Sequence, residues 1–147
     1  MKILVDADAC PVKAQIETIA KRFLLPVVML VDTSHILKSD YSEIVTVDKS
    51  ADSVDIALAN RVEAGDIVVT QDYGVAALAL GKGGYAINQN GLVYTNQNID
   101  ELLFARHIGK KVRRAGGKTG AAAKRTANDD LKFESEFIRL IQKIQML

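Results

Sequence analysis

Cysteine is nearly missing from this 147-residue chain, since Cys10 is the only one. A single thiol excludes an intrachain disulfide and a zinc site built from several cysteines, and it fits a reducing compartment. Only His35 and His107 could assist Cys10 as a nucleophile, because the chain holds no other histidine. We therefore expect Cys10 to be a small buried side chain and not a catalytic one.

Long apolar runs are also missing, and none approaches the roughly 20 residues that a membrane helix needs. Met1 and Lys2 lead into an apolar segment that ends at Asp6, too short and too acidic for a signal peptide. With 48% hydrophobic and 25% charged residues, the composition is typical of one globular domain with a real core. We expect a single cytoplasmic domain over residues 1–147 that makes no contact with a membrane.

Short apolar segments alternate with helical patterns through the first hundred residues. Strands are predicted at 3–5, 27–31, 44–47 and 67–70. Helices are predicted from Pro11 to about Phe23, from Asp52, and after Gly74. This alternation indicates an α/β fold with a mainly parallel sheet that is covered on both faces. Residues 85–87 and 92–94 are further strand candidates, joined by a hairpin-type turn at Asn90-Gly91.

Carboxylates follow two of these predicted strands. Asp6 and Asp8 come directly after Ile3-Leu4-Val5, and Asp72 follows the segment that ends at Thr70. Alternate residues of an extended segment point the same way, and the carboxyl ends of parallel strands share one edge of a sheet. Close carboxylates repel unless a proton or a cation joins them, and Mg²⁺ or Mn²⁺ prefers carboxylate oxygen. The pattern predicts a hard divalent ion at this edge.

Asp52 and Asp55 open the next helical segment and are three residues apart, so they are neighbours on a helix and can share a target. Acids in a first turn are also common because the helix dipole stabilises them, with Ser50 or Ser53 as a cap. Both interpretations stay open for this pair.

Charge divides the chain. Residues 1–100 carry 8 Lys and Arg against 13 Asp and Glu, whereas residues 101–147 carry 11 against 5. The bases concentrate between positions 106 and 125, at Arg106, Lys110, Lys111, Arg113, Arg114, Lys118, Lys124 and Arg125. Because glycines stand at 109, 116, 117 and 120, we expect a flexible basic loop over 109–127. Such an arm beside a metal site suits a nucleic acid, although it could also neutralise the acidic face of its own domain.

A C-terminal helix is predicted from about 128 to 146. Its apolar residues recur at helical spacing and form one stripe, made of Phe133, Phe137, Leu140, Ile141, Ile144 and Leu147. The stripe either completes the core or docks on a second subunit to form a homodimer.

Four motifs together resemble the YaiI/YqxD family of small bacterial proteins, which look like members of the PIN-like nuclease superfamily. They are VDADACPVK at 5–13, DSVD at 52–55, GDIVVTQD at 65–72 and RRAGGKTG at 113–120. The resemblance implies a three-layer α/β/α sandwich with a PIN-like sheet, one domain, and a nuclease that hydrolyses phosphodiester bonds, with RNA as the expected substrate.

Site residues follow from the same resemblance. It implies that Mg²⁺ or Mn²⁺ is held by Asp6, Asp8, Asp52 or Asp55, and Asp72. Thr70 would orient Asp72 or the attacking water through its hydroxyl group. Catalysis would then rest on Asp6, Asp8, Thr70 and Asp72, with the ion activating a bound water and offsetting charge on the phosphate.

Two other functions compete with this hypothesis. Phosphotransferases of the haloacid-dehalogenase type also carry Asp-x-Asp at the first strand end, with a nucleophilic first Asp and an acid/base second Asp. Asp6-Ala7-Asp8 fits that motif, but no matching later lysine and acidic pair can be placed. A non-catalytic RNA-binding or regulatory module is the other alternative, and strong salt-dependent binding without hydrolysis would distinguish it.

Overall fold

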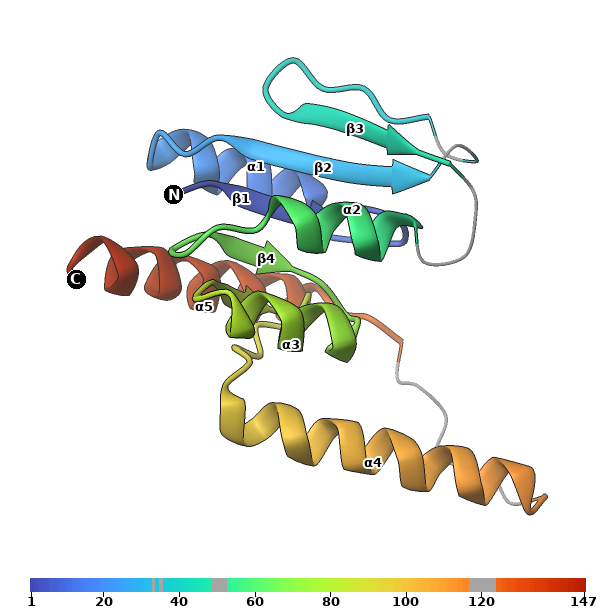
Figure 1. Cartoon of the computed structure of the whole chain (residues 1–147). Coiled ribbons are helices and arrows are strands. Elements are labelled where there is room, and N and C mark those ends of the chain that lie inside the picture. Colours follow the sequence, from blue (N-terminus) through green and yellow to red (C-terminus); the bar gives the residue numbers. More distant parts are fainter. Residues whose placement is uncertain (33, 35, 49–52, 117–123) are drawn as a thin grey trace.

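The computed structural model describes residues 1–32, 34, 36–48, 53–116 and 124–147, and within them five strands form a single sheet. The strands are β1 (Ile3–Asp6), β2 (Val27–Asp32), β3 (Glu43–Val47), β4 (Ile67–Val69) and β5 (Tyr85–Ile87). The helices are α1 (Lys13–Arg22), α2 (Ser53–Arg61), α3 (Tyr73–Gly81), α4 (Asn96–Arg114) and α5 (Ala127–Gln145). Figure 1 shows their arrangement.

All neighbouring strands in the sheet are parallel, in the order β3-β2-β1-β4-β5. Helices α1 and α5 cover one face, and α2 and α3 cover the other (Figure 1). Side chains alternate across the sheet, so that Ile3 and Val5 join the core under α1 and α5 while Leu4 joins the opposite core. This arrangement confirms the three-layer α/β/α sandwich.

The apolar stripe of α5 lies inside the protein's own core. Phe133, Phe137 and Ile141 are completely buried, and the two phenylalanine rings stack with centroids 5.1 Å apart. Most of the stripe therefore completes the domain's own core, while Leu147 at its end is 87% exposed. Docking of the C-terminal helix on a second subunit stays a prediction.

Two local expectations need correction. The predicted strand at 92–94 is reduced to one antiparallel bridge between Ile87 and Val93, because the Asn88 side chain accepts the N–H groups of Asn90 and Leu92 and ties the chain into a turn. The predicted flexible loop starts too early, since α4 continues through Gly109 to Arg114. One glycine costs a helix only about 1 kcal/mol, which does not end it.

No helix in the described part of the chain is long and apolar enough to cross a membrane.

Asp66 stabilises the edge of the sheet at which β1 and β4 begin, which is the edge opposite the carboxyl ends of the strands. Its carboxylate accepts the backbone N–H of Lys2 at 3.0 Å, the ammonium of Lys2 at 2.7 Å and the N–H of Glu63 at 2.9 Å. Burial by itself would raise the pKa of Asp66, but the Lys2 ammonium and these N–H groups outweigh it and lower the pKa below 3.8.

We expect Asp66→Ala to lower the free energy of unfolding by about 2–4 kcal/mol, because it leaves the Lys2 ammonium and two N–H groups without their acceptor. Because folding lowers the pKa, the charged form stabilises the fold above pH 3.8, and this contribution is lost as pH falls through the folded value. Urea denaturation at pH 7 and pH 3 measures both effects. Glu63→Gln is the control, because Glu63 is 81% exposed and lies 3.8 Å from the same ammonium. Equal losses in both variants would contradict this role for Asp66.

Candidate active site

The sheet has its topological switch point at β1. The chain winds outward to β2 and β3 on one side of β1 and to β4 and β5 on the other. In open α/β sheets the crevice beyond the carboxyl ends of the two strands at such a point is the usual ligand site. Asp6 is the last residue of β1, and Asp72 follows β4 by three residues, so both predicted acids lie at this crevice.

Thr70 joins these two acids. Its hydroxyl donates to Asp6 Oδ2 at 3.2 Å and accepts the backbone N–H of Asp72 at 3.0 Å. Thr70 is 3% exposed, and its carbonyl accepts the Tyr94 hydroxyl at 3.2 Å, so its position is fixed from both sides. The side chain expected to orient Asp72 thus contacts the backbone of Asp72 and the carboxylate of Asp6.

Asp72 is the N-cap of α3. Its Oδ1 accepts the N–H groups of Gly74 at 2.8 Å and Val75 at 3.1 Å, as expected for an acid at a helix start. Its other oxygen, Oδ2, accepts no hydrogen bond from the residues that the structure describes. One carboxylate therefore serves the fold with one oxygen and can serve a ligand with the other.

Asp8 is turned toward the end of β2, where its Oδ2 accepts the N–H of Asp32 at 3.2 Å. It shares a small pocket of about 40 Å³ with Asp6, Cys10 and Thr70.

Burial raises the pKa of the Cys10 thiol, which is 7% exposed and packs in the core. Cys10 is the buried side chain that the sequence led us to expect.

Carboxylates crowd around Asp6. Burial raises the pKa of Asp6 to about 6, and the Thr70 hydroxyl opposes that shift. The negative charges of Asp55, Asp8 and Asp72 add to it, in that order. Asp55, in the first turn of α2, is therefore close enough to Asp6 to raise its pKa, and its expected role as a metal ligand stays a prediction. Asp52 lies outside the described residues.

The carboxylates around Asp6 can be compared with what a hard cation such as Mg²⁺ requires. Within the described residues, no three or more His, Cys, Asp or Glu side chains form a group that could hold a metal ion. Mg²⁺ is commonly bound by only one or two carboxylates and completes its shell with water and substrate phosphate. Asp6 and Asp72 fit this requirement, because both carboxylates line the cleft and the negative charge of Asp72 raises the pKa of Asp6. They are the residues best placed to hold such an ion.

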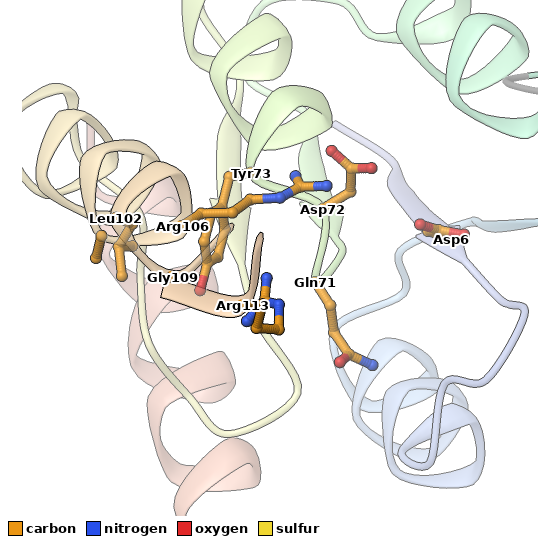
Figure 2. Close-up of a pocket in the computed structure, with 9 residues that line it drawn as sticks. Asp6, Gln71, Asp72, Tyr73, Leu102, Arg106, Gly109 and Arg113 are labelled. Atoms are coloured by element: carbon orange, nitrogen blue, oxygen red, sulfur yellow. The ribbon is translucent and has the colours of Figure 1, made fainter. Parts of the chain in front are cut away.

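An open cleft of about 630 Å³ lies over this acidic edge (Figure 2). Asp6 and Asp72 lie on one side of it, and α4 supplies the opposite side with Arg106 and Arg113. The guanidinium of Arg106 points across the cleft toward Asp72. The remaining lining residues are Gln71, Tyr73, Leu102, Ala105 and Gly109. Acidic and basic walls facing each other can hold a phosphate between a cation and two guanidinium groups.

The other predicted basic residues do not line the cleft. Lys110, Lys111 and Arg114 are exposed on α4 away from the cleft lining, and Lys124 is exposed before α5. Lys118 lies outside the described residues.

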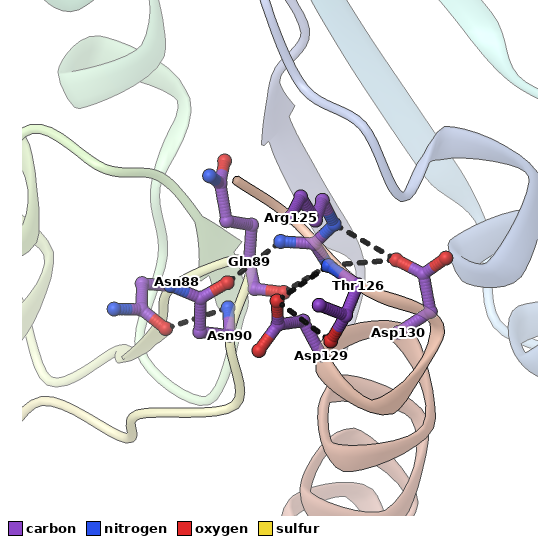
Figure 3. A network of polar contacts seen from close by, with 7 residues as sticks. All are labelled: Asn88, Gln89, Asn90, Arg125, Thr126, Asp129 and Asp130. Atoms are coloured by element: carbon purple, nitrogen blue, oxygen red, sulfur yellow. Dashed lines mark hydrogen bonds and ion pairs between the residues drawn. The ribbon is translucent and has the colours of Figure 1, made fainter. Parts of the chain in front are cut away.

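Arg125 has a structural role instead (Figure 3). It donates to Asp130 Oδ1 from Nε and from a terminal nitrogen, both at 2.8 Å, to Asn90 Oδ1 at 2.6 Å and to the Gln89 carbonyl at 2.8 Å. These contacts tie the turn after β5 to the start of α5. These internal hydrogen bonds give Arg125 a structural role that the sequence did not predict, and its part in a nucleic-acid surface stays a prediction.

The sequence did not lead us to predict the first half of α4, nor the two residues Leu102 and Ala105 through which it lines the cleft. A signal was present, because Thr95 and Asn98 form a capping box: Asn98 N–H donates to Thr95 Oγ1 at 3.0 Å and Thr95 N–H to Asn98 Oδ1 at 2.8 Å. The usual partner at the third position is Glu or Gln, so asparagine is easily overlooked.

Comparison with known proteins now identifies the family. A family model described as "Uncharacterized BCR, YaiI/YqxD family" matches residues 4–143. The chain belongs to the YaiI/YqxD family. It is 58% identical over 142 residues to a UPF0178 protein of Ruminiclostridium cellulolyticum, covering 97% of this chain and 93% of that relative. A UPF0178 protein of Clostridium acetobutylicum is 55% identical over 145 residues, covering 97% and 98%. No solved structure matches the chain.

Neither this family description nor the names of these relatives specify a reaction. The chemistry of the YaiI/YqxD site must therefore be argued from its residues.

Two substitutions distinguish the N-cap hydrogen bonds of Asp72 from its negative charge. We expect Asp72→Ala to lower the free energy of unfolding by about 1 kcal/mol, because α3 loses its cap. Asp72→Asn keeps an acceptor oxygen and should stay within about 0.5 kcal/mol of wild type. Urea denaturation measures both, with the exposed neighbour Gln71→Ala as control. An Asn variant as unstable as the Ala variant would show that the charge, and not the hydrogen bonds, stabilises α3.

Proposed function

We propose that this protein is a metal-dependent nuclease that hydrolyses phosphodiester bonds, with RNA as its substrate. The observation that carries the proposal is the cleft whose acidic side holds Asp6 and Asp72 and whose basic side holds Arg106 and Arg113. A phosphodiester is the substrate class that needs both, because its charge must be offset on the attacked side and its backbone must be held in place. The resemblance of the motifs to PIN-like nucleases supports the same reaction class.

Asp6 and Asp72 would hold Mg²⁺ or Mn²⁺ together with water, and Asp8 and Asp55 would add negative charge around them. When bound, such an ion lowers the pKa of a coordinated water and offsets charge on the phosphate. Thr70 keeps Asp6 and Asp72 in register through its two hydrogen bonds. Arg106 and Arg113 would bind the phosphate oxygens from the opposite side, and Tyr73 offers a ring on which a base can stack.

The ring of Tyr73 is held in place by a neighbour. It meets the buried ring of Tyr94 edge to face, with centroids 6.1 Å apart. A ring fixed in this way loses little conformational entropy when a base stacks on it, which suits single-stranded RNA.

A non-catalytic RNA-binding module is the second candidate. The observation that favours it is that no three-ligand metal group is found among the described residues. Such a module would use the same arginines and would keep the carboxylates as a structural cation site.

The phosphotransferase alternative fits less well. Its mechanism requires both acids of Asp6-Ala7-Asp8 to face the substrate. In the described residues Asp8 lines the small pocket and accepts the Asp32 N–H, and it is not among the residues that line the cleft.

We expect end-labelled single-stranded RNA to be cleaved by the wild type in Mn²⁺ and to stay intact in EDTA. Asp72→Asn should cut at least about 100-fold more slowly, because the metal site loses a charge while the α3 cap is kept. Single-turnover rates on a gel measure the effect, and the unfolding curve of the same variant shows that it is folded. Cleavage that persists in EDTA or in Asp72→Asn would overturn the metal-dependent mechanism. Tight binding without cleavage in any lane would favour the binding module.

The role of the two cleft arginines can be tested without chemistry. Arg106→Gln together with Arg113→Gln should weaken RNA binding in EDTA, and the slope of log K against log salt should become shallower by about 1.4 for two lost phosphate contacts. The matched control is Arg22→Gln with Arg61→Gln, which removes the same charge from the ends of α1 and α2, at the opposite edge of the sheet. Fluorescence anisotropy over a salt series measures both. Equal slopes for the two double variants would show that the binding is non-specific attraction to the whole protein.

A further inference from the structure

Helix α4 leaves most of its length uncovered. Ile99 is buried and Leu102 packs beside it near α3, but from Leu103 to Gly116 every residue except Gly109 is exposed. The C-terminal half of the helix extends past the rest of the domain (Figure 1). Helices of this length in water depend on tertiary packing along an apolar face, so an uncovered half helix indicates a missing partner.

The uncovered part carries an apolar face. Phe104 is 66% exposed, Ile108 41% and Val112 38%, and their spacing of four residues places them along one side of the helix. This side is distinct from the one that lines the cleft, which is formed by Leu102, Arg106, Gly109 and Arg113 among others. A partner on the apolar face would therefore leave the cleft open.

The arrangement of this face is palindromic. Glu101, Phe104, Ile108 and Lys111 follow one another at spacings of three, four and three residues, which is the spacing of one helical seam. If a second α4 is laid antiparallel on the first, reversal about the midpoint pairs Phe104 with Ile108 and Glu101 with Lys111. Each pair then occurs twice, apolar against apolar in the middle and acid against base at both ends.

We propose that two copies of this chain pair through α4, antiparallel and about a twofold axis, as a homodimer. The occupant of the apolar face is a second copy because the charges of the face complement those of its own reversed image, which is the condition for an isologous interface. Neither Glu101 nor Lys111 makes an ion pair within the described residues, so both are available across the interface.

The expected dimer is weak. The seam from Glu101 to Lys111 is shorter than the 19-residue helix that carries it and spans roughly 16 Å, and one helix pair is smaller than the standard interface of about 800 Å² per partner. We expect a dissociation constant on the order of 10 µM, so that monomer and dimer exchange over an accessible concentration range.

Sedimentation velocity of the full chain from about 1 to 200 µM tests the proposal. The wild type should shift with concentration from 16.0 kDa toward twice that mass. Glu101→Lys and Lys111→Glu should each weaken association at least about tenfold, because each places like charges together at both ends of the seam. The double variant with both substitutions restores opposite charges and should return to within about threefold of the wild type.

Leu103→Gln is the matched control, because Leu103 is also partly exposed on α4 but lies on the other side of the helix from the seam. It should leave the dissociation constant unchanged. Circular dichroism melts show whether each variant is folded, and none of these residues lines the cleft. A wild type that stays monomeric at the highest concentration overturns the proposal. So does a dimer that the single charge reversals leave intact, or a double variant that fails to recover.

Discussion

Repulsion between carboxylates at one edge of the sheet is the constraint around which the rest of this site is arranged. Asp6 is partly buried, and burial is the largest cause of its raised pKa; Asp55, Asp8 and Asp72 are near enough to raise it further. Such a cluster destabilises the folded state unless a proton or a cation offsets it. The fold tolerates it because Thr70 donates to Asp6, the α3 N-terminus donates to Asp72, and the β2 backbone donates to Asp8. Each hydrogen bond gives one carboxylate a donor and fixes the direction in which that carboxylate points.

The acids at the two edges of the sheet differ in whether a cation within the protein pairs with them. At the amino edge, Asp66 has a cation of its own in Lys2, and its pKa is lowered. At the carboxyl edge, no lysine or arginine forms an ion pair with Asp6 or Asp72 among the described residues, and Arg106 and Arg113 lie on the opposite side of the cleft. A buried acid with its own partner is a structural element. Acids that face cations across an open space are suited to a ligand that brings its own charges.

Much of this arrangement was accessible from the sequence. Apolar runs that end in aspartate predicted β1 and β4 and placed Asp6 and Asp72 together, because parallel strands share their carboxyl edge. The position of Asp55 near Asp6 was implied only by the family resemblance, because an acid at a helix start also fits a first-turn residue stabilised by the helix dipole. The path of α4 did not follow, because Gly109 and the lysines and arginines around it looked like a loop, and a capping box with asparagine at its third position gave a weak signal. The role of Arg125 was equally hidden, since its partners Asn90 and Gln89 lie 35 and 36 residues away along the chain.

Hydrophobic periodicity and the positions of the acids by themselves determined the α/β/α architecture and the acidic edge. Both depend on local residue spacing, because the backbone geometry of a strand or helix decides which side chains share a face and which are buried. Only the tertiary structure decided which basic residues meet that edge. Arg106 and Arg113 line the cleft because α4 packs on α3, whereas Arg125 is bound within the protein by Asp130 and the turn after β5. A charge has the same value wherever it stands in a sequence, but its partner is set by contacts between segments that are distant along the chain.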